Sequence, residues 1–154
     1  MPNTKRGSRG EPDVSYNAGV NGGVLTRCSV CNIADGLPVS DPIYFFFGGT
    51  SSGSPQWAGI TTLGDQLAHR RLGFINAALY RISKTPALYK AAFHDVTIGN
   101  NDVVEIGGQG YNAAKGWDPV TGLGTPNAVV LEPLIAILTY SSDAYNVIHN
   151  IGQN

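Results

Sequence analysis

Short apolar runs come first in this 154-residue chain, and helical stripes follow them. Two runs, Val24 to Thr26 and Ile43 to Phe47, have the length of strands and are bounded by turn residues. The second run is apolar at every position, which predicts a central strand covered on both faces. Residues 12–15 are expected to form a further short extended segment.

The rest of the chain predicts four helices around a loop-rich stretch. The first is expected from Trp57 to about His69, with one apolar stripe made of Trp57, Ile60, Leu63 and Leu67. Pro55 is expected in its first turn, where no intrahelical donor is lost. The other helices are expected over residues 74–82, 86–92 and 127–138, with a glycine-rich loop over residues 93–125.

Composition predicts one globular domain. The chain is 42% hydrophobic and 14% charged, which supplies a core and argues against disorder. Its net charge of −1 gives no electrostatic reason to expect nucleic acid or an anionic membrane as a partner. The basic N-terminus is followed by no apolar stretch, so no signal peptide is expected, and no apolar run approaches the roughly 20 residues of a membrane helix.

The two cysteines, Cys28 and Cys31, form a single C-x-x-C pair. A structural zinc site needs four ligands, and no second cysteine pair exists. The flanking residues also lack the helix start of a thioredoxin-like redox site. A local disulfide and a pair of free thiols both remain open.

The strongest chemical signal is the turn Gly48-Gly49-Thr50-Ser51-Ser52-Gly53-Ser54-Pro55, between the second apolar run and the first helix. A glycine-rich turn can lift a serine out of a sheet. The unpaired N–H groups and positive dipole end of a following helix would favour negative charge on Ser51 and on an oxyanion. A serine at a helix start is more often an N-cap, and here Ser52 or Ser54 could take that role.

Three further segments resemble the sedolisins, a family of serine-carboxyl peptidases. Residues 9–15 are similar to the family's R-G-x-P-D-V-S element, and residues 93–101 to its F-x-D-[IV]-T-x-G-x-N element. Residues 110–127 resemble its long G-Y-x-A-x-x-G-W-D-P-V-T-G-L-G-T-P-N block, which subtilases lack. The elements occur in the family's order.

The resemblance implies an α/β, subtilisin-like fold, present here in part, with parallel sheet strands and flanking helices. It implies that Ser51 is the nucleophile, activated by a glutamate that an aspartate four residues later supports. It also implies a calcium-binding loop region, in which Asp95 and Asp118 bind Ca²⁺ through side chains and Val96 and Gly116 through carbonyls. Hard carboxylate and carbonyl oxygens suit calcium. The alternative is that both aspartates merely cap turns.

The expected base is missing from this chain. No glutamate is followed by an aspartate four residues later, and every histidine follows Ser51, which also disfavours a subtilase triad. Residues 9–138 are therefore expected to be the C-terminal portion of a sedolisin catalytic domain, between a flexible N-terminus at 1–8 and a tail at 139–154. The chain alone is expected to be inactive or very weakly active.

Three hypotheses follow. The first is a fragment of a calcium-dependent, acid-active endopeptidase that acts on proteins or peptides and needs the missing N-terminal part of its domain. The second is an inactive calcium-stabilised remnant or binding module, and the third a subtilase fragment. Resemblance suggests an extracellular, secreted location, without a nucleic-acid or membrane partner.

Overall fold

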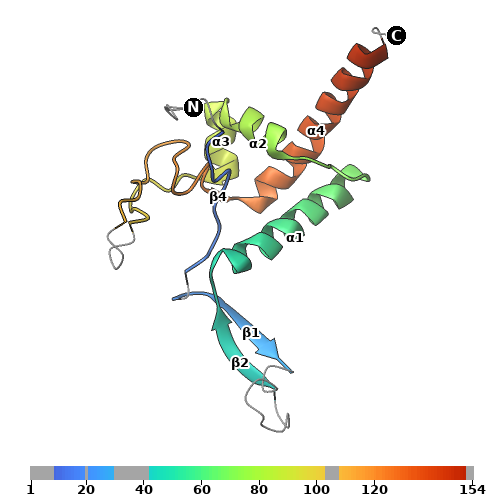
Figure 1. Ribbon diagram of the computed structural model, residues 1–154. Helices are drawn as coiled ribbons and strands as arrows, with labels where there is room; N and C mark the ends of the chain where they lie inside the picture. The colour runs from blue at the N-terminus through green and yellow to red at the C-terminus, as the bar shows by residue number, and fades with distance from the viewer. Residues whose placement is uncertain (1–8, 20, 30–41, 103–107, 152–154) are drawn as a thin grey trace. The chain divides into compact units, whose positions relative to one another are not determined.

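The computed structural model describes residues 9–19, 21–29, 42–102 and 108–151, with the backbone alone for 140–151 (Figure 1). The expected flexible N-terminus and Cys31 lie outside these residues. The described chain forms two compact units, one from residues 16–57 and one from the described parts of 1–15 and 58–154. No described helix is long and apolar enough to cross a membrane.

The unit of residues 16–57 contains a two-stranded hairpin. β1 (Val24–Cys28) pairs antiparallel with β2 (Ile43–Phe47), with Leu25 opposite Phe46. Both strands lie where the sequence predicts them, but their expected parallel, covered arrangement is wrong for the described residues. The side chains of Leu25, Tyr44 and Phe46 are 61%, 63% and 63% exposed. An all-apolar strand signals potential for burial, and no second layer of the described unit covers it.

α1 (Thr50–Ala68) begins seven residues earlier than expected and ends near the expected residue. Gly49, with a φ of 81°, turns the chain from the strand directly into the helix. Pro55 therefore lies inside α1 and not in its first turn. Because proline has no N–H, it cannot donate to the carbonyl of Ser51, four residues earlier. The serines and glycines around Ser51 resemble a loop in composition, which is why the pattern placed the start too late.

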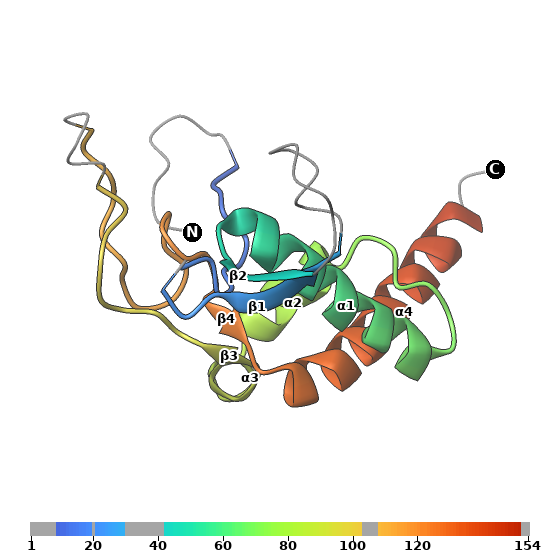
Figure 2. The same ribbon diagram turned by 90° about the horizontal axis from the view of Figure 1, so that it is seen from below.

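The larger unit is a helical layer with a short ladder beside it (Figure 2). α2 (Asn76–Ser83) contacts both α3 (Pro86–Ala92) and α4 (Ala128–Ile151). β3 (Phe93–His94) follows α3 and pairs antiparallel with β4 (Thr125–Pro126), just before α4. The pairing of β3 with β4 thus brings the two ends of the loop between them together. The buried apolar core is Ile60, Leu72, Ala78, Leu79, Ile82, Ala92, Phe93, Leu123, Leu131 and Ile135.

The buried face of α1 differs from the predicted stripe. Ile60 is buried, but Leu63 and Leu67 are 49% and 54% exposed. Gly64 is buried instead, and a Cβ there would lie 2.9 Å from Leu72 Cδ1 and 3.1 Å from Ile135 Cδ1. A small residue lets α4 approach α1 closely, so the stripe of large side chains pointed to the wrong face.

The helices at residues 74–82 and 86–92 are confirmed, with small changes of bounds. The last helix is longer than expected: α4 continues to Ile151 through most of the tail. It begins directly after Asn127, whose side-chain amide donates to the Ala91 carbonyl at 3.1 Å. Pro133 lies within α4 without ending it.

Ile82 tests this core. Its side chain is fully buried between helices, so Ile82→Ala should lower the free energy of unfolding by about 2–5 kcal/mol in urea titrations, through lost transfer energy and a cavity. Val129→Ala is the control, since Val129 is 84% exposed and its loss should change stability by less than about 0.5 kcal/mol. Equal effects of the two changes would contradict the described core.

Candidate functional site

Ser51 lies in the first turn of α1, on an exposed surface. The preceding Gly49 has a left-handed φ that disfavours any side chain, and its N–H donates to the Ala18 carbonyl at 2.6 Å. First-turn N–H groups have no intrahelical acceptor and favour negative charge. The local backbone therefore suits a serine that must carry developing negative charge.

The neighbouring serine has a different environment. Ser52 is 3% exposed, its N–H donates to the Gly49 carbonyl at 2.9 Å, and its hydroxyl accepts a bond of 3.1 Å from Gln56 Nε2. These bonds lie within the start of α1 and use Ser52 to hold the turn. Ser51, next to it, is the serine that solvent or a substrate can reach.

The described part of the unit that contains Ser51 offers this serine no base. The described residues between 16 and 57 contain no histidine, aspartate or glutamate. A serine hydroxyl without a neighbouring base is a weak nucleophile. The nucleophilic role of Ser51 therefore stays a prediction.

In the other unit, the structure brings together two of the loops predicted to bind calcium. The N–H of Gly116 donates to Asp95 Oδ2 at 2.9 Å. The other carboxylate oxygen, Asp95 Oδ1, is buried and has no hydrogen-bond partner. A buried carboxylate oxygen without a donor is costly, and a cation would satisfy it. Val96 follows in the same loop and is half-buried.

Asp118 organises its own turn. Its Oδ1 accepts from the N–H groups of Val120 and Thr121, both at 2.8 Å. Its Oδ2 accepts from the Ala114 N–H at 3.1 Å and the Thr121 hydroxyl at 3.0 Å. Burial alone would raise the pKa of Asp118, but these hydrogen bonds outweigh it and lower the pKa from its ordinary value.

Tyr89 links the two aspartates electrostatically. Its hydroxyl donates to the Leu123 carbonyl at 3.1 Å. Burial raises the pKa of Tyr89 far above its ordinary value, and its side-chain interaction with Asp95 and then the charge of Asp118 raise it further. Both carboxylates therefore act on the same phenol.

These contacts test the fit of calcium. The partnerless oxygen of Asp95 fits a hard cation directly. Asp118 fits less directly, because four hydrogen bonds already use about the full acceptor capacity of a carboxylate. Among the described residues, no group of three or more His, Cys, Asp or Glu side chains could hold a metal ion. The predicted calcium ligands include only two carboxylates, with backbone carbonyls as the others, so that search does not test them. The calcium site therefore stays a prediction.

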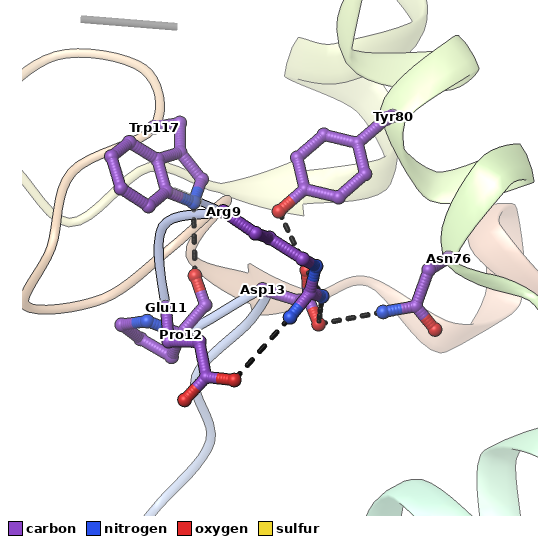
Figure 3. Close-up of polar contacts among 7 residues, drawn as sticks. All are labelled: Arg9, Glu11, Pro12, Asp13, Asn76, Tyr80 and Trp117. Atoms are coloured by element: carbon purple, nitrogen blue, oxygen red, sulfur yellow. Dashed lines mark hydrogen bonds and ion pairs between the residues drawn. The ribbon is translucent and has the colours of Figure 1, made fainter. Parts of the chain in front are cut away.

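The sequence missed the role of Asp13, which is the centre of a polar cluster (Figure 3). Its carboxylate accepts from Asn76 Nδ2 and the Tyr80 hydroxyl, both at 2.6 Å, and pairs with Arg9. Two of these donors belong to α2. The contact with Tyr80 spans 67 residues, and nothing in the local pattern around Asp13 predicts it.

The segment that carries Asp13 also lies against the glycine-rich block. The Leu123 N–H donates to the Asp13 carbonyl at 2.8 Å, and the Ser15 N–H donates to the Gly124 carbonyl at 3.0 Å. Gly122 has a φ of 61°, and a Cβ there would lie 2.4 Å from the Asp13 carbonyl. Only glycine fits this contact, so two motifs that are more than a hundred residues apart form one structural element.

Comparison with known proteins assigns the chain to a family. It is 36% identical over 128 residues to tripeptidyl-peptidase sed1 of Aspergillus fumigatus, a match of 77% of this chain and 18% of that protein. It is 32% identical over 145 residues to kumamolisin of a Bacillus species, which covers 94% of this chain and 25% of kumamolisin. Sedolisin of a Pseudomonas species is 35% identical over 130 residues, with 84% and 19% covered.

The chain belongs to the sedolisin family. The recognition made from the motifs is thus confirmed. No family model matches the chain. This sedolisin-family chain spans between 18% and 25% of the length of the three relatives.

Cys28, at the end of β1, is disulfide-bonded, which removes the free-thiol alternative for this residue.

The cluster around Asp13 can be tested by removing its charge. Asp13→Asn keeps the shape but weakens three contacts, so we expect the free energy of unfolding to fall by about 1–3 kcal/mol in urea titrations. Glu11→Gln is the matched control, because Glu11 is 81% exposed and its 3.4 Å contact with Arg9 should contribute less than about 0.5 kcal/mol. No difference between the two variants would refute a central role for Asp13.

The environment of Tyr80 leads us to expect a loss of stability at alkaline pH. Burial, and then its hydrogen bond to Asp13, raises the pKa of Tyr80 to about 12. Stability from this group is full below the unfolded pKa of about 10 and is lost as the pH rises through 12, because only the unfolded state readily ionises. The Tm of the protein should therefore fall as the pH rises from about 10 to about 12, and this fall should be smaller in Tyr80→Phe. The exposed Tyr111→Phe should keep the wild-type decline.

Proposed function

We propose that this chain is the nucleophile-bearing segment of a serine-carboxyl peptidase that cleaves proteins or peptides in acid. The main support is the exposed Ser51 in the first turn of α1, two residues after a glycine with a left-handed φ. In the complete site, a glutamate would take the Ser51 proton, and Ser51 would attack the peptide carbonyl to form an acyl-enzyme. Two relatives, one named as a tripeptidyl-peptidase and one as sedolisin, support this assignment.

The proposal includes the position of the segment in its domain. Residues 9–138 would form the C-terminal portion of the catalytic domain. The Glu-x-x-x-Asp pair, and a separate aspartate that helps to stabilise the oxyanion in this family, would come from residues outside this chain. The chain covers only 18% and 25% of the length of two relatives, which is compatible with such a portion of a longer protein. The exposed apolar side chains of β1 and β2 also support it, since large exposed apolar patches mark surfaces that another element covers.

The second candidate is an inactive remnant that acts as a binding module. The absence of any Glu-x-x-x-Asp pair from the sequence favours it. A subtilase fragment is less well supported, because the motifs and the relatives both belong to the sedolisins.

Calcium and an extracellular location belong to the same proposal. Asp95 and Asp118 would bind Ca²⁺ through side chains, and Val96 and Gly116 through carbonyls. The partnerless Asp95 Oδ1 supports the first of these ligands. The disulfide at Cys28 supports an oxidising compartment, where such bonds persist.

Activity tests the proposal in two steps. We expect the chain alone to leave a peptide library uncut at acid pH, and the chain extended by its upstream coding sequence to cut it. In the extended protein, Ser51→Ala should lower kcat by at least about 10⁴-fold, because the nucleophile is lost. Ser54→Ala, three residues along the exposed start of α1, is the control and should remain active. Cleavage that survives Ser51→Ala would overturn the proposal, and an inactive extended protein would favour the remnant.

Calcium can be tested by melting the same protein with and without a chelator. A ligand that binds only the folded state raises stability by mass action, so chelation should lower the Tm. The main effect of Asp95→Asn should be to abolish the response of the Tm to the chelator, with a smaller effect on the Tm itself. The reason is that the partnerless oxygen of Asp95 is the group expected to need the ion. Asp102→Asn, on an exposed part of the same loop region, should keep the full response. A wild-type Tm that is indifferent to the chelator would rule out the site.

A further inference from the structure

The larger unit contains a pocket of about 470 Å³ beside α2, and Gly116, one of the proposed calcium ligands, lies in its lining. Its lining includes Tyr80, Lys84, Tyr89, Lys115 and Trp117. The volume lies in the range of small-molecule sites. Aromatic rings and lysines together describe a site with an apolar wall and a cationic rim.

The wall is fixed by contacts outside the pocket. The indole N–H of Trp117 donates to the Pro12 carbonyl at 2.9 Å (Figure 3). Gly10 lies against the same ring, where a Cβ would be 2.5 Å from an indole carbon. The indole is thus held in place with its only donor already used, so it offers a ligand apolar surface alone.

The hydroxyl groups that line the pocket also have their hydrogens engaged. Tyr80 donates to Asp13 Oδ1 at 2.6 Å, Ser83 to the Tyr80 carbonyl at 2.9 Å, and Tyr89 to the Leu123 carbonyl at 3.1 Å. Among the lining side chains, the donors that remain for a ligand are the ammonium groups of Lys84 and Lys115.

Neither of these two lysines makes an ion pair with a described residue. Both are exposed, and within the described residues the ion pairs are those that Arg9 makes with Glu11 and Asp13. Lys84 follows the end of α2, where a cation also complements the helix dipole, and Lys115 precedes Gly116 in the glycine-rich block. Of the acidic residues nearby, Asp13 pairs with Arg9, Asp118 accepts four hydrogen bonds and Asp95 accepts one from Gly116, and none of the three pairs with either lysine.

We propose that this pocket binds a carboxylate carried on an aromatic group, with the carboxylate at Lys84 and Lys115 and the ring against Trp117. An ammonium group pairs with a carboxylate through charge-assisted hydrogen bonds, and a held indole favours an offset or edge-on ring. The inference is independent of the peptidase activity. The same chemistry occurs in a free aromatic acid and in a peptide that ends in an aromatic residue.

Fluorescence of Trp117 gives a direct test. In a Trp57→Phe background Trp117 is the sole tryptophan, and N-acetylphenylalanine should change its emission in a saturable way. N-acetylphenylalaninamide has the same ring without the charge, and it should bind about tenfold more weakly. Lys84→Gln combined with Lys115→Gln should weaken binding of the acid by a similar factor and leave the amide unchanged. The exposed Lys90→Gln is the matched control and should bind like the background protein.

A third probe, 3-phenylpropionate, distinguishes the sources. Tighter binding of N-acetylphenylalanine indicates a peptide terminus, and equal or tighter binding of 3-phenylpropionate indicates a free acid. Circular dichroism establishes that each variant is folded. Equal affinity for acid and amide, or an unchanged affinity in the folded double-lysine variant, would overturn the proposal.

Discussion

The carboxylate of Asp13 is the contact on which the described larger unit depends most. It joins a segment near the start of the chain to α2 through Asn76 and Tyr80, while the backbone of the same segment bonds to Leu123. A partly buried carboxylate needs such donors, and each donor here comes from a part of the chain that must already be folded. The hydrophobic core of α2, α3 and α4 and the polar cluster therefore support each other. The Asp13 side chain accepts from Tyr80, and the backbone of the same segment bonds to the glycine-rich block.

Much of this arrangement could be predicted from the sequence, and the failures have physical causes. Local signals located both strands of the hairpin and the two short helices, because their lengths and boundaries are set by nearby residues. The pairing direction of the strands depends on which segments meet in space, and an all-apolar strand does not specify its neighbours. The buried face of α1 was misjudged because Gly64, which has no side chain, forms the close contact.

Part of the candidate site could likewise be predicted from the sequence, and part could not. Motifs drew attention to Ser51, Asp95 and Asp118, and the structure gives each a distinct environment: an exposed helix start, a buried partnerless oxygen and a saturated turn. The Asp13 cluster was invisible, although Asp13 lies within a recognised motif. Its donors are tens of residues away, and no periodicity or spacing links them. The pocket beside Trp117 was missed for the same reason, since its lining comes from four separate stretches of the chain.

The hairpin has a consequence for how such a protein could mature. β2 ends at Phe47, and the turn that positions the proposed nucleophile begins at the very next residue. An element that packs over the exposed face of β2 would hide its aromatic side chains and restrain the strand that leads into the Ser51 turn. Burial of the apolar side chains and restraint of the serine turn would then occur in the same step.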